Sequence, residues 1–102
     1  MDPILVYITH PDLKTAEKIV AFLLKNRLIA CGNISPIKSF YWWKGKIKNS
    51  QEFVSILKTT DKNWLKIKSK VAKIHPYKIP CIMKINVQMN DEYESWIKNE
   101  IK

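Results

Sequence analysis

Two cysteines and two histidines carry the widest range of chemistry in this chain: Cys31, Cys81, His10 and His75. A cysteine thiolate suits soft Cu(I) or borderline Zn(II), and a histidine can bind a metal or transfer a proton. The cysteines lie fifty positions apart and form no CxxC pair, so we expect free thiols instead of a disulfide. The alternative to a metal role is that both cysteines are small buried packing residues and that His10 lies on a loop surface.

An active site would have to be built from Glu52, Lys58, His75 and Tyr77, which are the acid–base groups that could meet at a crevice. No nucleophile and base occur in a known pairing among them. The chain has only 2 glycines, so no glycine-rich loop can cradle a phosphate. We therefore expect a protein that is not an enzyme.

Charge and composition narrow the choice of partners. The net charge is +9, but Arg27 is the only arginine among 18 basic residues, and the lysines are spread along the whole chain. Because lysine lacks the planar fork that binds bases and phosphates in bidentate fashion, this pattern favours solubility over a polyanion site. No run approaches the roughly 20 apolar residues of a membrane span. Residues 1–4 lack the features of a signal peptide, so we expect a cytoplasmic protein without membrane insertion.

The first half of the chain, within a single domain of residues 1–102, alternates strand and helix patterns. Residues 4–8 are a short apolar run typical of a buried strand, and Asp12 can cap the helix that follows. The inward stripe of that helix recurs at i, i+3 and i+4 spacing: Ala16, Ile19, Val20, Leu23 and Leu24. An extended segment follows over 29–41, interrupted by Pro36, and a return strand is expected over about 47–59.

The second half predicts another helix, a strand and a last helix. Asp61 can cap the second helix, and His75-Pro76 ends it. The inward face of this helix is expected to be Trp64, Ile67, Val71 and Ile74. The strand has one wholly apolar face, made of Ile79, Cys81, Met83, Ile85, Val87 and Met89. Asn90 can cap the final short helix.

This β-α-β-β-α-β order, followed by a C-terminal helix, predicts an α+β, ferredoxin-like split βαβ fold. Its sheet would be four-stranded and antiparallel, with a long hairpin between the second and third strands. An RNA-recognition module has the same order. The segment 52–58 nevertheless has one aromatic residue and no glycine, unlike the RNA-binding strand pattern, so we expect no specific nucleic-acid binding.

Four consecutive bulky residues, Phe40, Tyr41, Trp42 and Trp43, precede Gly45, the residue that permits a tight reversal. Successive side chains of a strand point to opposite faces, so both faces of this hairpin need cover. We expect another copy of the chain to supply it in a closed symmetric oligomer. The alternative is a monomer whose last helix folds across the open face of the sheet.

Four motifs, in this order, resemble those of the CutA divalent-cation-tolerance family: Ala30-Cys-Gly-Asn-Ile34, the run SFYWWKGKI at 39–47, Glu52 with Lys58-Thr59, and His75-Pro-Tyr-Lys-Ile-Pro80. The resemblance spans almost the whole chain. It implies a cytoplasmic homotrimer with strands pairing across subunits, similar in architecture to PII-type signal proteins, and a link to copper or another divalent metal. A PII-like sensor of a small ligand or anion is the alternative function.

Cys31 and His75 stand at their family places, and Cys81 is a further candidate ligand because its thiolate suits soft Cu(I). The expected metal ligands are Cys31, His75 and Cys81, and the expected ligand crevice contains Asn33, Glu52, Lys58 and Tyr77.

The sequence departs from the family pattern where Lys44, Lys78 and Cys81 replace the usual glutamates and Gly32 replaces a β-branched residue. Because ammonium groups repel cations, we expect a thiol-dependent preference for soft Cu(I).

Overall fold

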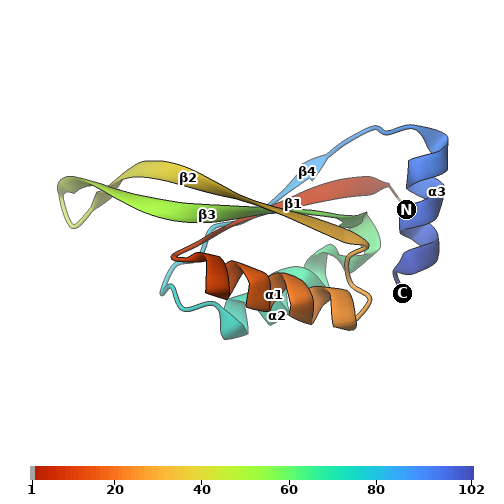
Figure 1. Cartoon of the computed structure of the whole chain (residues 1–102), viewed down its shortest axis with the longest axis horizontal. Helices are drawn as coiled ribbons and strands as arrows, with labels where there is room; N and C mark the ends of the chain where they lie inside the picture. Colours follow the sequence, from red (N-terminus) through yellow and green to blue (C-terminus); the bar gives the residue numbers. More distant parts are fainter. Residues whose placement is uncertain (1) are drawn as a thin grey trace.

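A four-stranded antiparallel sheet forms the centre of the molecule in the computed structural model, which describes residues 2–102 (Figure 1). Met1, the first residue of the amino-terminal segment considered above, lies outside the described residues. The sheet order is β2-β3-β1-β4. The strands are β1 (Pro3–His10), β2 (Cys31–Trp43), β3 (Lys46–Thr60) and β4 (Ile82–Asn86), and the helices are α1 (Leu13–Lys25), α2 (Trp64–Ile74) and α3 (Asp91–Glu100).

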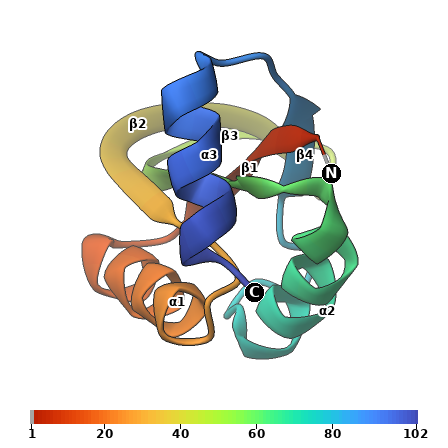
Figure 2. The same ribbon diagram turned by 90° about the vertical axis from the view of Figure 1, so that its right-hand side faces the viewer.

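Helices α1 and α2 lie side by side against one face of the sheet, while α3 stands at its end (Figures 1 and 2). The predicted ferredoxin-like α+β fold with its long hairpin is confirmed. Among the described residues, no helix is both long enough and apolar enough to cross a membrane.

The core lies between the sheet and the two helices. In β1 every second side chain, Ile4, Val6 and Ile8, is fully buried, as alternation requires. Its partners from the helices are Ala16, Ile19, Val20, Leu23, Ile67 and Val71. The predicted stripe of α1 is confirmed except for Leu24, which is 40% exposed.

The two helices begin differently from each other. Asp12 caps α1 as predicted, because its carboxylate accepts the Thr15 N–H at 2.7 Å. The predicted cap at Asp61 is wrong. Asp61 opens a short 3₁₀ turn that ends at Asn63, and its carboxylate instead pairs with the Lys84 ammonium of β4 at 2.5 Å. A competing ion pair has therefore taken the side chain that would have capped α2.

The β2-β3 hairpin extends well beyond the helices, so the molecule measures 45 × 24 × 21 Å. Lys44 (φ 51°) and Gly45 (φ 76°) form its two-residue turn between the paired Trp43 and Lys46. Positive φ at both central residues is the type I′ pattern, whose twist matches that of the flanking strands. The turn predicted at Gly45 therefore also holds Lys44 in a left-handed conformation.

Strand β4 is shorter than its sequence pattern predicts. Its ladder joins Ile82–Asn86 to Ile4–Ile8 of β1, so the strand ends at Asn86 although the alternation continues to Met89. The apolar face predicted for this strand is not part of the core: its residues Met83 and Ile85 are 47% and 46% exposed on the face away from the helices.

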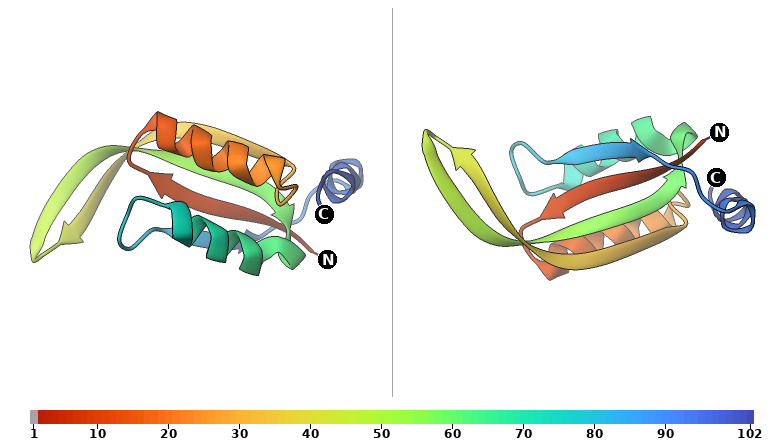
Figure 3. Two further views of the ribbon diagram at one scale, coloured as in Figure 1. Left: turned by 90° about the horizontal axis from the view of Figure 1, so that it is seen from below. Right: turned by 90° about the horizontal axis from the view of Figure 1, so that it is seen from above.

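We call this face the open face. It carries Leu5, Tyr7, Ile56, Met83 and Ile85. Figure 3 (right) shows it uncovered, with α3 beyond its end instead of across it.

Candidate functional site

A cavity of about 700 Å³ lies at the base of the hairpin, where the loop after α2 passes beside the sheet. We call it the hairpin crevice. Its lining residues are Thr9, Ser39, Tyr41, Trp43, Lys48, Glu52, Pro76, Tyr77, Lys78, Ile79 and Cys81. Its volume falls within the range of small-molecule sites. A second cavity, of about 620 Å³, lies between β4 and α3 and is lined by none of the predicted site residues.

Strand alternation explains why the hairpin contributes these side chains. Ser39, Tyr41 and Trp43 are every second residue of β2, so they share one face of the hairpin. The register pairs Tyr41 with Lys48, which places Lys48, and Glu52 four residues later, on the same face of β3. Phe40 and Trp42 point to the other face and are 68% and 71% exposed.

Glu52 and Tyr77 form the central contact of the hairpin crevice. The Tyr77 hydroxyl donates a short hydrogen bond to Glu52 Oε2, and Glu52 is only 8% exposed. Burial raises the pKa of Tyr77 well above its usual value, and the hydrogen bond and negative charge of Glu52 raise it further. Tyr77 is therefore a neutral donor, which fits ligand positioning better than proton abstraction.

His75 holds the loop that carries Tyr77. Its Nε2 donates to the Thr9 carbonyl at 2.8 Å, and its Nδ1 accepts the Tyr77 N–H at 3.1 Å. Because a carbonyl can only accept and an amide N–H can only donate, these two bonds assign the neutral tautomer with hydrogen on Nε2. A metal bound to His75 would have to displace one of the two hydrogen bonds.

The prediction that His10 lies on a loop surface is wrong. His10 is the last residue of β1 and is fully buried, with Nε2 2.8 Å from Ser55 Oγ. Its Nδ1 has no partner among the described residues, and its ring stacks on His75 with centroids 5.5 Å apart. Burial, and after it the neighbouring His75, lower the pKa of His10 to about 4. The alternation Ile4, Val6, Ile8 continues to position 10, and that signal could have predicted its burial.

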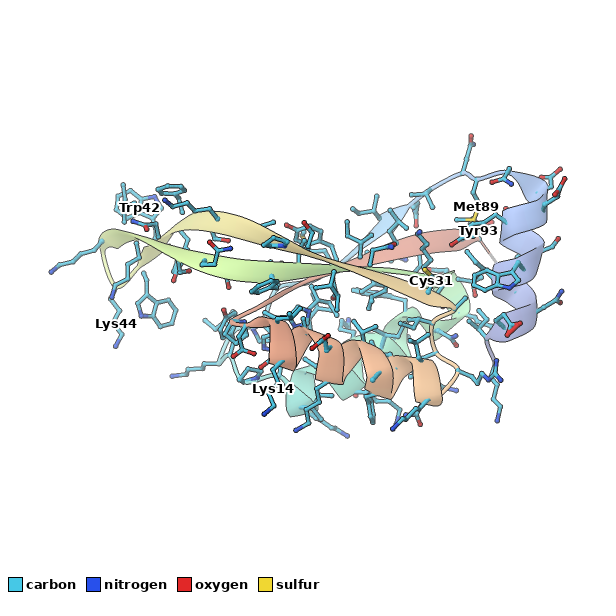
Figure 4. The ribbon with its side chains drawn as sticks, viewed as in Figure 1. Lys14, Cys31, Trp42, Lys44, Met89 and Tyr93 are labelled. Carbon is cyan, nitrogen blue, oxygen red and sulfur yellow. The ribbon has the colours of Figure 1, made fainter. Side chains whose placement is uncertain are left out.

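The predicted metal ligands lie in two places. Cys81 lines the hairpin crevice close to the His75 loop, whereas Cys31 starts the edge strand β2, opposite Lys58. Figure 4 shows Cys31 toward the α3 end of the sheet, far from the hairpin tip that Trp42 marks. Both cysteines are free thiols, as predicted, and burial raises the pKa of the Cys81 thiol. Within residues 2–102, no three His, Cys, Asp or Glu side chains gather in a group that could hold a metal ion.

The residues predicted to line the ligand crevice also lie in different places. Glu52 and Tyr77 line the hairpin crevice, but Asn33 and Lys58 do not. Asn33 is exposed opposite Ile56, and the Lys58 ammonium lies 5.5 Å from the centre of the Tyr93 ring of α3. Sequence reasoning missed Thr9, Ser39 and Lys48 as lining residues.

Comparison with known proteins gives the family. The model of the CutA1 divalent ion tolerance protein family matches residues 4–100. This chain belongs to the CutA1 family. The divalent-cation tolerance proteins CutA of Pyrococcus horikoshii and Archaeoglobus fulgidus are 45% and 41% identical to it. The first match covers 97% of this chain and 98% of the Pyrococcus protein. The second match covers 95% of this chain and 96% of the Archaeoglobus protein.

Solved CutA1 structures agree with this assignment. The crystal structure of CutA1 from Pyrococcus horikoshii superposes with a TM-score of 0.94 at 44% identity, covering 97% of this chain and 98% of that one. The structure described as the periplasmic divalent cation tolerance protein CutA from Archaeoglobus fulgidus gives 0.96 at 40% identity, covering 98% and 99%. The predicted family resemblance is thus confirmed over nearly the full chain.

Two of the three residues that replace expected CutA1 glutamates line the hairpin crevice, namely Lys78 and Cys81. Lys44 lies at the hairpin turn instead. The crevice of this CutA1 protein therefore contains two ammonium groups, Lys48 and Lys78, and one carboxylate, Glu52.

Proposed function

We propose that this CutA1 protein acts in divalent-cation tolerance as a non-catalytic homotrimer, with the hairpin crevice as its ligand site. The observation that carries this proposal is the Glu52–Tyr77 contact inside a cavity of ligand size. Glu52 and Tyr77 are engaged with each other, and His75, which holds the Tyr77 loop, is engaged with the backbone, so these three groups form no nucleophile–base pair. This arrangement supports binding without turnover.

The exposed apolar surface supports the trimer. Met83 and Ile85 on the open face are nearly half exposed, and Phe40 and Trp42, on the face of the hairpin away from the crevice, are 68% and 71% exposed. A surface of this kind favours burial against another copy. Strand β2, which carries Phe40 and Trp42, is also an edge of the sheet and can pair with a neighbouring subunit.

Sedimentation equilibrium at micromolar concentration tests the assembly. We expect a trimer for the parent and dissociation for Met83→Glu, because the substitution places a charge in the apolar contact. Leu65→Glu is the matched control, since Leu65 is 68% exposed on α2, on the covered side of the sheet. A monomeric parent, or equal dissociation of the two variants, would contradict the proposed interface.

For the metal, we propose soft Cu(I) or another thiol-seeking ion, with Cys81 in the hairpin crevice and the predicted partners Cys31 and His75 as the remaining ligands to test. The support is chemical: Cys81 borders a crevice whose lysines disfavour hard cations. Under reducing conditions, Cys81→Ser should weaken Cu(I) binding relative to the parent. Equal affinity in the parent, Cys31→Ser and Cys81→Ser would remove both cysteines from the site.

The alternative function, PII-like sensing of a small ligand or anion, is favoured by Lys48 and Lys78 in the same crevice. For the location we propose the cytoplasm, on the basis of the two free thiols. Cell fractionation tests this location. We also propose that nucleic acid is not a specific partner, so binding to single-stranded RNA should be weak and should disappear at moderate salt.

A further inference from the structure

We propose that the hairpin crevice binds a small organic anion that carries a planar ring at one end and a carboxylate or phosphate at the other. This inference deepens the alternative function and rests on the crevice being the ligand site.

The charge of the crevice favours an anion. Lys48 reaches it from β3 and Lys78 from the loop after α2, and both lysines are exposed. Neither takes part in the ion pairs found within residues 2–102. The one lining carboxylate, Glu52, already accepts the Tyr77 hydroxyl. Two ammonium groups without carboxylate partners therefore border the cavity, and an incoming anion can pair with them.

One wall of the crevice is aromatic and apolar. Tyr41 and Trp43 lie two residues apart on one face of β2, about 7 Å along the strand, and each is 41% exposed. Pro76 and the 75% exposed Ile79 face the cavity from the loop. A planar ring can stack on such a wall, and aromatic contacts of this kind are worth about 1 kcal/mol each beyond area burial.

Neutral polar groups complete the lining. Ser39 and Thr9 bring hydroxyls, and Cys81 brings a thiol that burial keeps protonated. These groups can donate hydrogen bonds to a carboxylate or phosphate without adding negative charge. A hard divalent cation would instead meet two ammonium groups and a single carboxylate, which is a poor ligand set for it.

The test uses the full protein and four probes that separate ring from charge: 2-naphthoate, 1-naphthyl phosphate, neutral 2-naphthamide and inorganic phosphate. Isothermal titration calorimetry at low salt should show at least one naphthyl anion binding about tenfold tighter than 2-naphthamide and tighter than inorganic phosphate. The two anions distinguish a carboxylate ligand from a phosphate ligand.

Substitutions locate the binding. Lys48→Gln and Lys78→Gln should each weaken the favoured anion up to about fivefold, as expected for the loss of one exposed ion pair. Lys78→Arg should retain affinity. Lys70→Gln is the matched control, because Lys70 is an exposed lysine of α2 that does not line the crevice. Both lysines are exposed, so the variants should fold like the parent.

Two results would overturn the inference: 2-naphthamide binding as tightly as 2-naphthoate and 1-naphthyl phosphate, or Lys70→Gln weakening the anion as much as Lys78→Gln. If no naphthyl compound binds while Cu(I) binding depends on Cys81, the anion inference fails and the proposed metal function stands. If naphthyl anions and Cu(I) both fail to bind the trimer, the crevice is no ligand site, and both proposals fail together.

Discussion

Replacing His10 by glutamine should remove a large part of the acid sensitivity of this protein. His10 is fully buried at the end of β1, and the one hydrogen bond of its side chain within residues 2–102 links Nε2 to Ser55 Oγ at 2.8 Å. The amide nitrogen of glutamine can take the place of Nε2 and keep this bond. The substitution therefore removes a titrating ring while it preserves the polar contact.

The pKa of His10 sets the size and direction of the effect. Its value is 6.5 in an unfolded chain and about 4 in the fold, because burial and the neighbouring His75 both disfavour the charged ring, and Asp12 and Glu52 only partly offset them. The unfolded chain thus binds more protons between these two pH values, and the free energy of unfolding falls as the pH drops from 6.5 to 4. The gap between the two pKa values corresponds to about 3 kcal/mol. This stability is fully present above pH 6.5 and is lost as the pH falls toward 4.

Urea unfolding at a series of pH values from 4 to 7.5 measures the effect. The protein concentration has to stay constant, because unfolding of an oligomer depends on it. Between pH 7 and pH 4, the parent should lose about 3 kcal/mol per subunit more than His10→Gln. The comparison uses the change of unfolding free energy with pH. A difference in stability between the two proteins that is the same at every pH therefore does not affect it. Parallel curves for the two proteins would refute the argument that a neutral, buried His10 supports the fold.

Three further substitutions probe the packing and the crevice. Gly32→Ala should lower the free energy of unfolding by about 1–3 kcal/mol, because a Cβ there would lie 2.7 Å from Val20 Cγ1. Adding Val20→Ala should restore part of the lost stability, and unchanged thermal melting of Gly32→Ala would contradict the predicted clash. Lys44→Asn should raise the melting temperature, since asparagine adopts the observed φ of 51° more readily than lysine and forms a favoured turn with the glycine that follows. We expect a gain of about 0.5–1 kcal/mol in stability, and a loss of stability would count against the turn assignment. Tyr77→Phe should lower the free energy of unfolding by about 1–3 kcal/mol at pH 7, because Glu52 loses its hydroxyl donor. The loss should be smaller in a Glu52→Gln background. Equal losses in both backgrounds, measured by chemical denaturation, would show that the two residues are not coupled.

Features that depend on neighbouring residues along the chain could be predicted well. The alternation of Ile4, Val6 and Ile8 and the stripe of α1 follow from strand and helix periodicity, and both proved to be core. The hairpin turn at Gly45 follows from its tolerance of positive φ. With the motifs around them, these patterns were enough to predict the fold and the family.

Other predictions failed because a distant partner competed with a local preference. Asp61 was expected to cap α2, but Lys84, 23 positions away in sequence, holds its carboxylate. The alternation after position 79 predicted a long strand, but only Ile82–Asn86 pair with β1. Before Ile82, Pro80 has no N–H to donate, and the Thr9 carbonyl of β1 accepts the His75 ring instead of a strand neighbour.

The candidate site also has features that the sequence determined and features that depend on contacts between distant segments. The sequence by itself determined which groups are available: two thiols, two histidines, a run of aromatic residues and many lysines. Only the tertiary structure decided their neighbours. Cys31 begins the edge strand β2 and Cys81 comes just before the other edge strand, β4, whereas the loop after α2 brings Tyr77 into hydrogen-bonding contact with Glu52 of β3. Which residues share a cavity depends on strand order and register, and both are determined by pairing between segments far apart in the chain.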